Sequence, residues 1–293
     1  MHMFMRAIGF SREMSRSEFN DFIINSSVLA EKKSYTSRDD KTMTYEYCKE
    51  FADGIGICIR GEYDEEEKLH YDYSFPYLAG TGISSDEEVI VDRHAEKESY
   101  AGTCDELKVG VSLIFYLQNM VSYLKYRNSG RLPILPTSLT LSALSVEGSI
   151  ILPIEKKKDE RRQVRSITNN RNRLLAQARN GDEEAIENIT MEDMDTYSVI
   201  SRKILKEDVY SLVDTSFMPH GVECDQYFVI AEILECREVK NSLTGEEVYI
   251  MRLCANDLEF DTCINKADLL GEPVVGRRFK GVIWMQGHIN YPE

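Results

Sequence analysis

Alternation of apolar and polar residues dominates two stretches of the chain and predicts antiparallel strands in both. In the first stretch, three runs at Met43–Phe51, Ile55–Tyr63 and Lys68–Leu78 are separated by turn-like segments. Tyrosine or isoleucine recurs at every second position within these runs, which is typical of a sheet with one buried face. A helix precedes them, because Ser15 and Glu18 form a capping box. A helix followed by such a meander predicts an α+β fold for the first half.

Shorter patterns complete the first half of the chain. Turn residues and changes of hydrophobic period set their limits. The predicted elements are, in order, a strand at Met5–Phe10, a loop at 31–42, a strand at Glu88–Asp92, one long strand at Leu107–Leu117, a helix that ends before Asn128, and a hairpin made of Ser138–Ser145 and Ser149–Pro153 around Glu147-Gly148.

Strand patterns return in the last part of the chain. Four strands and one short helix fit within it, which resembles a small closed β-barrel of the oligonucleotide/oligosaccharide-binding (OB) type. Such a barrel has five strands, and the pattern places only four of them. Topology alone is weak evidence for function. The predicted elements are strands at Tyr227–Val239, Glu247–Ala255, Leu258–Ile264 and Gly276–Ile289, with a short helix at Asn265–Leu270.

A helical connector is predicted between these two strand-rich parts. Its first helix, Lys156–Asn180, is strongly basic and carries an apolar stripe that must pack against something. Gly181 is placed to end this helix. Two acidic helices follow, at Asp182–Ile189 and from Thr190 to about Leu205. We therefore expect an antiparallel-sheet domain at 1–154, a helical connector at 155–217 and a small OB-like barrel at 218–293.

Composition and charge narrow the classes of function. An apolar content of 42% with 29% charged residues is that of a folded globular chain. The net charge of -15 repels phosphate backbones, so it counts against nucleic-acid binding. The positive charge is concentrated in the predicted basic helix, which can contact nucleic acid, a second copy of the chain or the acidic remainder of the same chain.

Cysteine usage and hydropathy indicate the compartment. The seven cysteines are scattered and form no C-x-x-C pair, which counts against a disulfide framework and a structural zinc site. No segment has the length and hydropathy of a signal peptide or a membrane span. We expect a cytoplasmic protein that does not bind a membrane and has neither a metal nor a cofactor.

The densest ionisable cluster in a predicted loop contains His94, Glu96 and Glu98. His94 and Glu96 match the H-x-E motif of zinc deaminases, but the P-C-x-x-C that completes that metal site is missing. A solvated charged loop is the favoured interpretation. These three residues are nevertheless the first candidates for acid–base chemistry, because imidazole titrates near neutral pH.

Basic and aromatic residues alternate on the last predicted strand. Arg277, Arg278 and Lys280 precede Trp284, and such a combination can bind single-stranded nucleic acid. The favoured interpretation places the aromatic side chains in the barrel core and pairs the arginines with nearby carboxylates. The corresponding candidates on the basic helix are Arg161, Arg162 and Arg165.

Segments along nearly the whole chain resemble an uncharacterised bacterial family that is known only as a domain of unknown function. The resemblance implies that the two halves and the connector occur together as one unit, and it assigns no activity. Our leading hypothesis is a non-enzymatic binding or assembly protein, with an unknown protein partner or self-association as a homodimer. The alternatives are single-stranded nucleic-acid binding and a hydrolytic or transfer enzyme near His94. The segments are MHMFMRAIGFS, HAEKESYAGTCDELKVGVSLIFYLQN, NGDEEAIENITMEDMDTYSVISRKI, EDVYSLVD, LTGEEVYIMRL and GEPVVGRRFKGVIWMQG.

Overall fold

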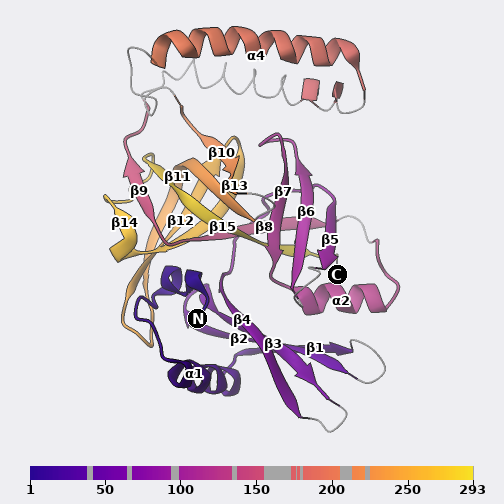
Figure 1. The fold of residues 1–293 in the computed structure, drawn as a ribbon, viewed down its shortest axis with the longest axis vertical. Coiled ribbons are helices and arrows are strands. Elements are labelled where there is room, and N and C mark those ends of the chain that lie inside the picture. Colours follow the sequence, from indigo (N-terminus) through magenta and orange to yellow (C-terminus); the bar gives the residue numbers. More distant parts are fainter. Residues whose placement is uncertain are drawn as a thin grey trace.

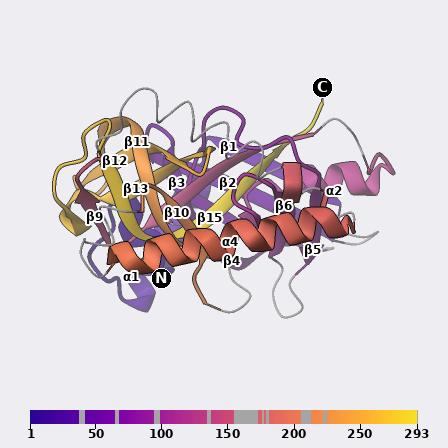
Figure 2. The same ribbon diagram turned by 90° about the horizontal axis from the view of Figure 1, so that it is seen from above.

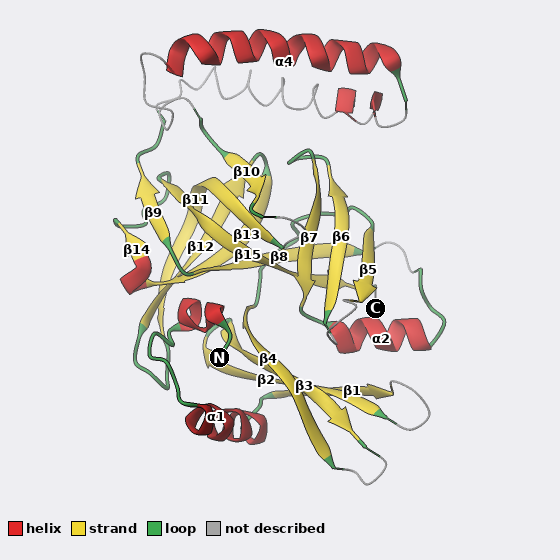
Figure 3. Cartoon of the chain, in the orientation of Figure 1, coloured by secondary structure: helices red, strands yellow, loops and turns green. Residues whose placement is uncertain are grey.

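Two β-sheets and a few helices make up the chain, as the sequence predicted for an α+β protein (Figures 1 and 3). The computed structural model describes residues 1–37, 42–64, 68–93, 99–133, 137–154, 173–175, 177–178, 181–204, 213–221 and 225–292. The smaller sheet is antiparallel, with the order β1-β2-β3-β4. Its strands are β1 (Lys32–Ser37), β2 (Met43–Ala52), β3 (Ile55–Tyr63) and β4 (Leu69–Leu78).

The larger sheet contains the other described strands, and its main path runs β10-β11-β12-β13-β8-β15-β7-β6-β5. Two short strands, β9 and β14, lie off this path. The strands are β5 (Val89–Arg93), β6 (Tyr100–Glu106), β7 (Val111–Leu117), β8 (Ser138–Ser145), β9 (Gly148–Ile151), β10 (Ser216–Pro219), β11 (Gln226–Lys240), β12 (Glu247–Ala255), β13 (Leu258–Asn265), β14 (Leu269–Leu270) and β15 (Arg278–Asn290).

The helices lie at the margins of these sheets. Helix α1 lies beside the smaller sheet, and α4 lies at the opposite end of the molecule (Figure 1). Seen from above, α4 extends across the larger sheet (Figure 2). The helices are η1 (Met3–Ile8), α1 (Arg16–Val28), α2 (Met120–Asn128), α4 (Glu183–Ile204) and η2 (Lys266–Asp268).

Five strands of the larger sheet close into a ring. β11 pairs with β12, β12 with β13, β13 with β8, β8 with β15, and β15 returns to β11. Among these five pairings, only that of β13 with β8 is parallel. Residues 226–232 of β11 pair with β15 and residues 232–240 pair with β12, and a bulge between Ile233 and Glu235 interrupts the pairing with β12. One member of this ring is β8, which the sequence predicted as a strand of the first half but not as a neighbour of β13 and β15.

Two of the predicted N-terminal elements are wrong. Met5–Phe10 is not a strand, because the 3₁₀ helix η1 occupies this region. The His2 ring accepts a hydrogen bond from the Phe4 amide, and Gly9 ends the helix with a φ of 89°. Residues 31–42 were expected to form a loop, but β1 pairs with β2 along six residues. Polar residues are tolerated on β1 because it is an edge strand.

The long strand predicted at Leu107–Leu117 is also wrong. β6 ends at Glu106, a turn follows, and β7 begins at Val111. The turn is closed by hydrogen bonds from the Lys108 amide to the Glu106 carboxylate and from the Gly110 amide to the Glu106 carbonyl. Gly110 has a φ of 70°, which suits glycine. The apolar alternation continues through this turn, so the pattern alone concealed it.

The hairpin predicted around Glu147-Gly148 is a fourth error. Both β8 and β9 pair antiparallel with β15, so they form one interrupted strand that keeps its direction. Ser145 bridges the interruption by donating to the Val282 carbonyl at 2.8 Å. Gly148 is needed for packing, because a Cβ there would lie 2.5 Å from the Phe279 ring. A glycine that allows close approach was mistaken for a turn glycine.

The two acidic helices predicted after Gly181 are one helix, α4. Asp182 caps it by accepting hydrogen bonds from the amides of Glu184 and Ala185. Thr190 was expected to cap a second helix, but its hydroxyl donates to the Ile186 carbonyl within α4. Most of the predicted basic helix lies outside the described residues. Of its described residues, 173–175 and 177–178 are helical, and Gly181 has a φ of 86°.

The N-terminal segment covers one outer face of the ring. Val248, Ile250 and Cys263 belong to the same buried cluster as η1 and the smaller sheet. The Asn241 amide donates to the Ile8 carbonyl at 2.8 Å, and Thr244 donates to the Gly9 carbonyl at 2.6 Å. The interior of the ring forms a second cluster together with β5–β7 and α2. The first of these clusters is therefore an apolar core that the smaller sheet shares with the outer face of the ring. The proposed division at 1–154, 155–217 and 218–293 stays a prediction, and β8 pairs across it.

Candidate functional site

An apolar groove lies between α1 and the smaller sheet. Its volume is about 340 Å³. That size is within the range of small-molecule sites, which are concave and mainly apolar. Ten of the described residues line it, and tyrosine is the most frequent type among them. They are Ile23, Ile24, Ser27 and Val28 of α1, Lys33 of β1, Tyr45 and Tyr47 of β2, Tyr63 of β3, and Leu69 and Tyr71 of β4.

The groove exists because α1 covers only part of the sheet. Ser15 fixes the start of the helix, since its hydroxyl accepts from the Glu18 amide and its amide donates to the Glu18 carboxylate at 2.8 Å. Phe22 and Ile23 are buried against the sheet. Ile24 and Val28, by contrast, remain 61% and 69% exposed. The helix ends at Val28, so the far end of the tyrosine-bearing face stays open.

The tyrosine hydroxyls give the groove its polar groups. Tyr47 and Tyr63 share a hydrogen bond at 2.7 Å, and Tyr45 donates to the His70 carbonyl at 3.4 Å. Burial raises the pKa of Tyr47 to about 12, and Tyr63 adds to the shift. Burial also raises the pKa of Tyr45. These phenols are therefore neutral at physiological pH. Tyr45 donates its proton to the His70 carbonyl, and the Tyr47–Tyr63 pair retains one proton that it can donate to a ligand.

Lys33 supplies a positive charge at the rim. Its ammonium donates to the Val28 carbonyl at 3.3 Å and lies 5.2 Å from the centre of the Tyr47 ring. The helix C-terminus and the aromatic face both favour a cation at this position. Lys33 is the single charged residue among the ten that line the groove.

The opposite face of the same sheet holds a buried ion pair. Arg60 is 1% exposed and contacts the Glu46 carboxylate at 2.7 Å. Its guanidinium also donates to the Tyr73 hydroxyl at 3.0 Å and to the Gln118 carbonyl at 2.6 Å. Burial raises the pKa of Glu46, and Arg60 opposes that shift. The ion pair therefore ties β2 and β3 to β7 and the segment that follows it.

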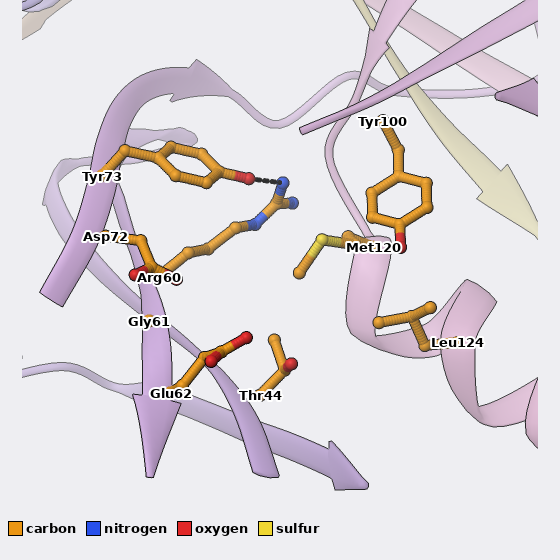
Figure 4. A pocket seen from close by; sticks show the side chains of 9 residues that line it. All are labelled: Thr44, Arg60, Gly61, Glu62, Asp72, Tyr73, Tyr100, Met120 and Leu124. Carbon is orange, nitrogen blue, oxygen red and sulfur yellow. Dashed lines mark hydrogen bonds between the residues drawn. The ribbon is translucent and has the colours of Figure 1, made fainter. Parts of the chain in front are cut away.

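The cavity beside Arg60 is small. Figure 4 shows Arg60 and Tyr73 on one side, with Tyr100, Met120 and Leu124 facing them across the gap. The space has a volume of about 10 Å³. This volume accommodates about one water molecule. The arrangement serves to satisfy a buried charge, and we do not regard it as a ligand pocket.

The basic and aromatic candidates on β15 are not brought together. Arg278 is 4% exposed and donates to the carbonyls of Leu152 at 2.7 Å and Val213 at 2.6 Å. Arg277 is partly exposed and donates to the Glu272 carbonyl at 3.0 Å. Lys280 is also partly exposed. The Arg278 side chain thus joins β15 to β9 and to the segment before β10.

Trp284 lies in the shared core. It is 4% exposed, and its ring stacks on Phe4 with the centroids 5.2 Å apart. The indole N–H donates to the Asp225 carboxylate at 2.6 Å. The centre of the Tyr116 ring, on the neighbouring strand β7, lies 5.2 Å from the centre of the indole ring. In this position the indole offers no face on which a nucleic-acid base could stack.

The remaining predicted site residues lie outside the described residues. His94, Glu96 and Glu98 fall between β5 and β6, and Arg161, Arg162 and Arg165 fall in the connector. Their roles stay predictions. Sequence reasoning missed the groove, although the alternating tyrosines of β2 were a usable signal. The pattern showed that these rings share one face, but not that α1 ends before covering them.

Comparisons with known proteins agree with the resemblance seen in the sequence. No curated protein and no solved structure matches the chain. Within the described residues, none of the helices has the length and apolar character to cross a membrane. One family model matches residues 5–287 of the 293. Because this match spans nearly the whole sequence, the chain belongs to the family described as "Domain of unknown function, E. rectale Gene description (DUF3881)".

Proposed function

We propose that this chain is a non-enzymatic binding protein whose groove takes a small, mainly apolar molecule that carries one anionic group. The observation that carries the proposal is the open groove of about 340 Å³ between α1 and the smaller sheet. Burial of an apolar ligand there removes the exposed surfaces of Ile24, Val28 and Tyr71 from water. Neutral tyrosine hydroxyls fix its orientation.

The anionic group follows from the charge at the rim. Lys33 is held beside the groove, whereas the chain as a whole has a net charge of -15. A carboxylate on the ligand would therefore meet its ion-pair partner at this point. An uncharged ligand of the same shape would fill the groove without that contact, so the two classes can be separated by experiment.

The test compares medium-chain and arylalkyl carboxylates with the corresponding amides, by calorimetry and ligand-observed NMR on the full chain. We expect the carboxylates to bind more tightly. Lys33→Met should remove this preference, and Ile24→Asp should abolish binding of both classes. Leu243→Asp serves as the matched control, because Leu243 is 62% exposed in the turn after β11. Binding that survives Ile24→Asp, or equal affinity for acid and amide, would refute the proposal.

We also propose that the five-strand ring is OB-like. Its order and its single parallel pair match the OB arrangement, and the bulged strand β11 pairs with both neighbours as the first OB strand does. The chain order is permuted, since β8 occupies the place of the last OB strand. OB folds bind their ligands on strands two and three and the adjoining loops. The corresponding β12–β13 face is covered here by η1.

Because η1 covers this face, nucleic-acid binding by the ring has less support than ligand binding in the groove. A scaffold role for the ring agrees better with the buried positions of Arg278 and Trp284. The alternative predicts salt-dependent binding of single strands that is lost on Arg277→Ala together with Lys280→Ala. Self-association and catalysis near His94 stay predictions. Light scattering at high protein concentration tests the first of these.

A further inference from the structure

Two cysteines face each other on the side of the smaller sheet that lies opposite the groove. Cys48 of β2 and Cys58 of β3 are direct cross-strand partners. Both carry free thiols; Cys58 is buried and Cys48 is partly exposed. The sequence predicted no metal site because no C-x-x-C pair is present. Cross-strand pairing brings the thiols together without that spacing.

A carboxylate completes the cluster. Glu46 lies two residues before Cys48, so it points to the same face of β2. The two sulfur atoms and one Glu46 oxygen all lie within 4.8 Å of one another. Thiolates and a carboxylate are ligands that zinc and similar d¹⁰ cations accept, with bond lengths of about 2.0–2.3 Å. A small contraction would bring all three atoms into coordination distance.

A buried hydroxyl beside the thiols is a second observation. Tyr77 is 7% exposed, and its hydroxyl has no hydrogen-bond partner among the described residues. A Cβ at Gly56 would lie 2.8 Å from this hydroxyl, and Gly56 shares its face of β3 with Cys58. The phenol therefore lacks an acceptor that a thiolate would provide.

The charges of the cluster favour a divalent ion. Arg60 contacts Glu46 at 2.7 Å. With both cysteines ionised, the thiolates and Glu46 carry three negative charges, and Arg60 with a divalent cation carries three positive charges. A buried site with no net charge avoids the large cost of an isolated buried charge. Lys32 and Glu50, which flank the thiols, pair with each other at 3.4 Å.

We propose that Cys48, Cys58 and Glu46 form a binding site for a divalent d¹⁰ cation such as Zn²⁺. Each thiol releases its proton to solvent, two sulfur–metal bonds form, and no electron is transferred. Glu46 supplies an oxygen ligand and keeps its contact with Arg60, while Tyr77 donates a hydrogen bond to a thiolate. The site is independent of the groove, because it lies on the other face of the sheet.

The test titrates the full, reduced chain with Cd²⁺ and follows the ultraviolet charge-transfer band of Cd²⁺–thiolate bonds; Zn²⁺ affinity is then obtained by competition with a chelator. We expect release of about two protons for each ion bound. Cys48→Ser and Cys58→Ser should each weaken binding at least about tenfold. The matched control is Cys104→Ser, since Cys104 is a buried thiol in the other core cluster.

Unfolding curves of each variant check that the change does not act through folding. Cys58→Ser alters a buried position, so Cys48→Ser, at a partly exposed position, keeps the test decisive if the first variant fails to fold. Three results would overturn the proposal: no charge-transfer band at stoichiometric Cd²⁺, an unchanged band in Cys48→Ser, or an equal loss in Cys104→Ser.

Discussion

The two faces of the smaller sheet are built from the same alternating strands, yet they treat polar groups in opposite ways. On the closed face, Arg60 is 1% exposed, and its guanidinium is held by an ion pair, by hydrogen bonds and by the ring of Phe75, whose centre lies 4.6 Å away. On the open face, Tyr71 is 44% exposed and borders empty space. The contrast shows that packing against a neighbour, not strand composition, decides which face keeps open space beside its side chains.

The largest expected effect comes from breaking the closed face. Arg60→Met leaves Glu46 buried without its counter-ion, which should lower the free energy of unfolding by about 3–5 kcal/mol. Chemical denaturation of the variant measures the loss. The double variant Arg60→Met with Glu46→Leu removes both charges and should recover most of the stability. No recovery in the double variant would show that Arg60 acts through packing alone.

A second prediction concerns the close packing of the backbone on the open face. Gly61 lies under Tyr45, and a Cβ added there would lie 2.0 Å from the His70 carbonyl oxygen. Gly61→Ala therefore has to displace the backbone of β4, with an expected loss of about 1–3 kcal/mol. Thermal unfolding measures it. An unchanged unfolding temperature in Gly61→Ala would mean that the steric argument is wrong.

A third prediction concerns the helix that bounds the groove. Ser15→Ala removes the side-chain acceptor of the Glu18 amide at the start of α1. The expected cost is about 1 kcal/mol in the free energy of unfolding. Relative to the wild type, amide hydrogen exchange in this variant should become faster in α1 and change little in β3. Uniformly faster exchange throughout the sheet would mean that the two faces are not independent.

The last prediction concerns alkaline pH and the access of solvent to the groove. The pKa of Tyr47 is raised from its ordinary value of 10.0 to about 12. Because the folded state holds this proton more tightly, Tyr47 contributes stability that is fully present below pH 10 and lost as the pH rises toward 12. Ultraviolet titration of tyrosinate in the wild type and Tyr47→Phe checks this. A difference spectrum that titrates near pH 10 would contradict it.

Local signals predicted much of the fold. The capping box at Ser15, the strand Ile55–Tyr63 and the meander from β11 to β13 follow from residues that are close in sequence, and all are present. Long-range pairs were missed. Nothing near Ser138–Ser145 indicates that this strand pairs with β13 and β15, because that choice depends on residues far along the chain.

The candidate sites illustrate the same limit. Arg60 follows an apolar strand residue and looks like a solvent-facing charge until its partner Glu46 is seen across the register. Cys48 and Cys58 look like unrelated thiols for the same reason. Trp284 has a basic neighbourhood in sequence, which made a binding surface the alternative to the favoured core position; its contacts with Phe4 and Asp225 are internal.

The five-strand ring also has a consequence during protein synthesis. β8 leaves the ribosome before any of its ring neighbours, and Ser142 must wait for Asp261 and Gln286 to be made before both of its edges are paired. A strand with two unpaired edges is prone to associate with other nascent chains. We therefore expect the interval between synthesis of β8 and β15 to be the stage at which this protein depends most on chaperones.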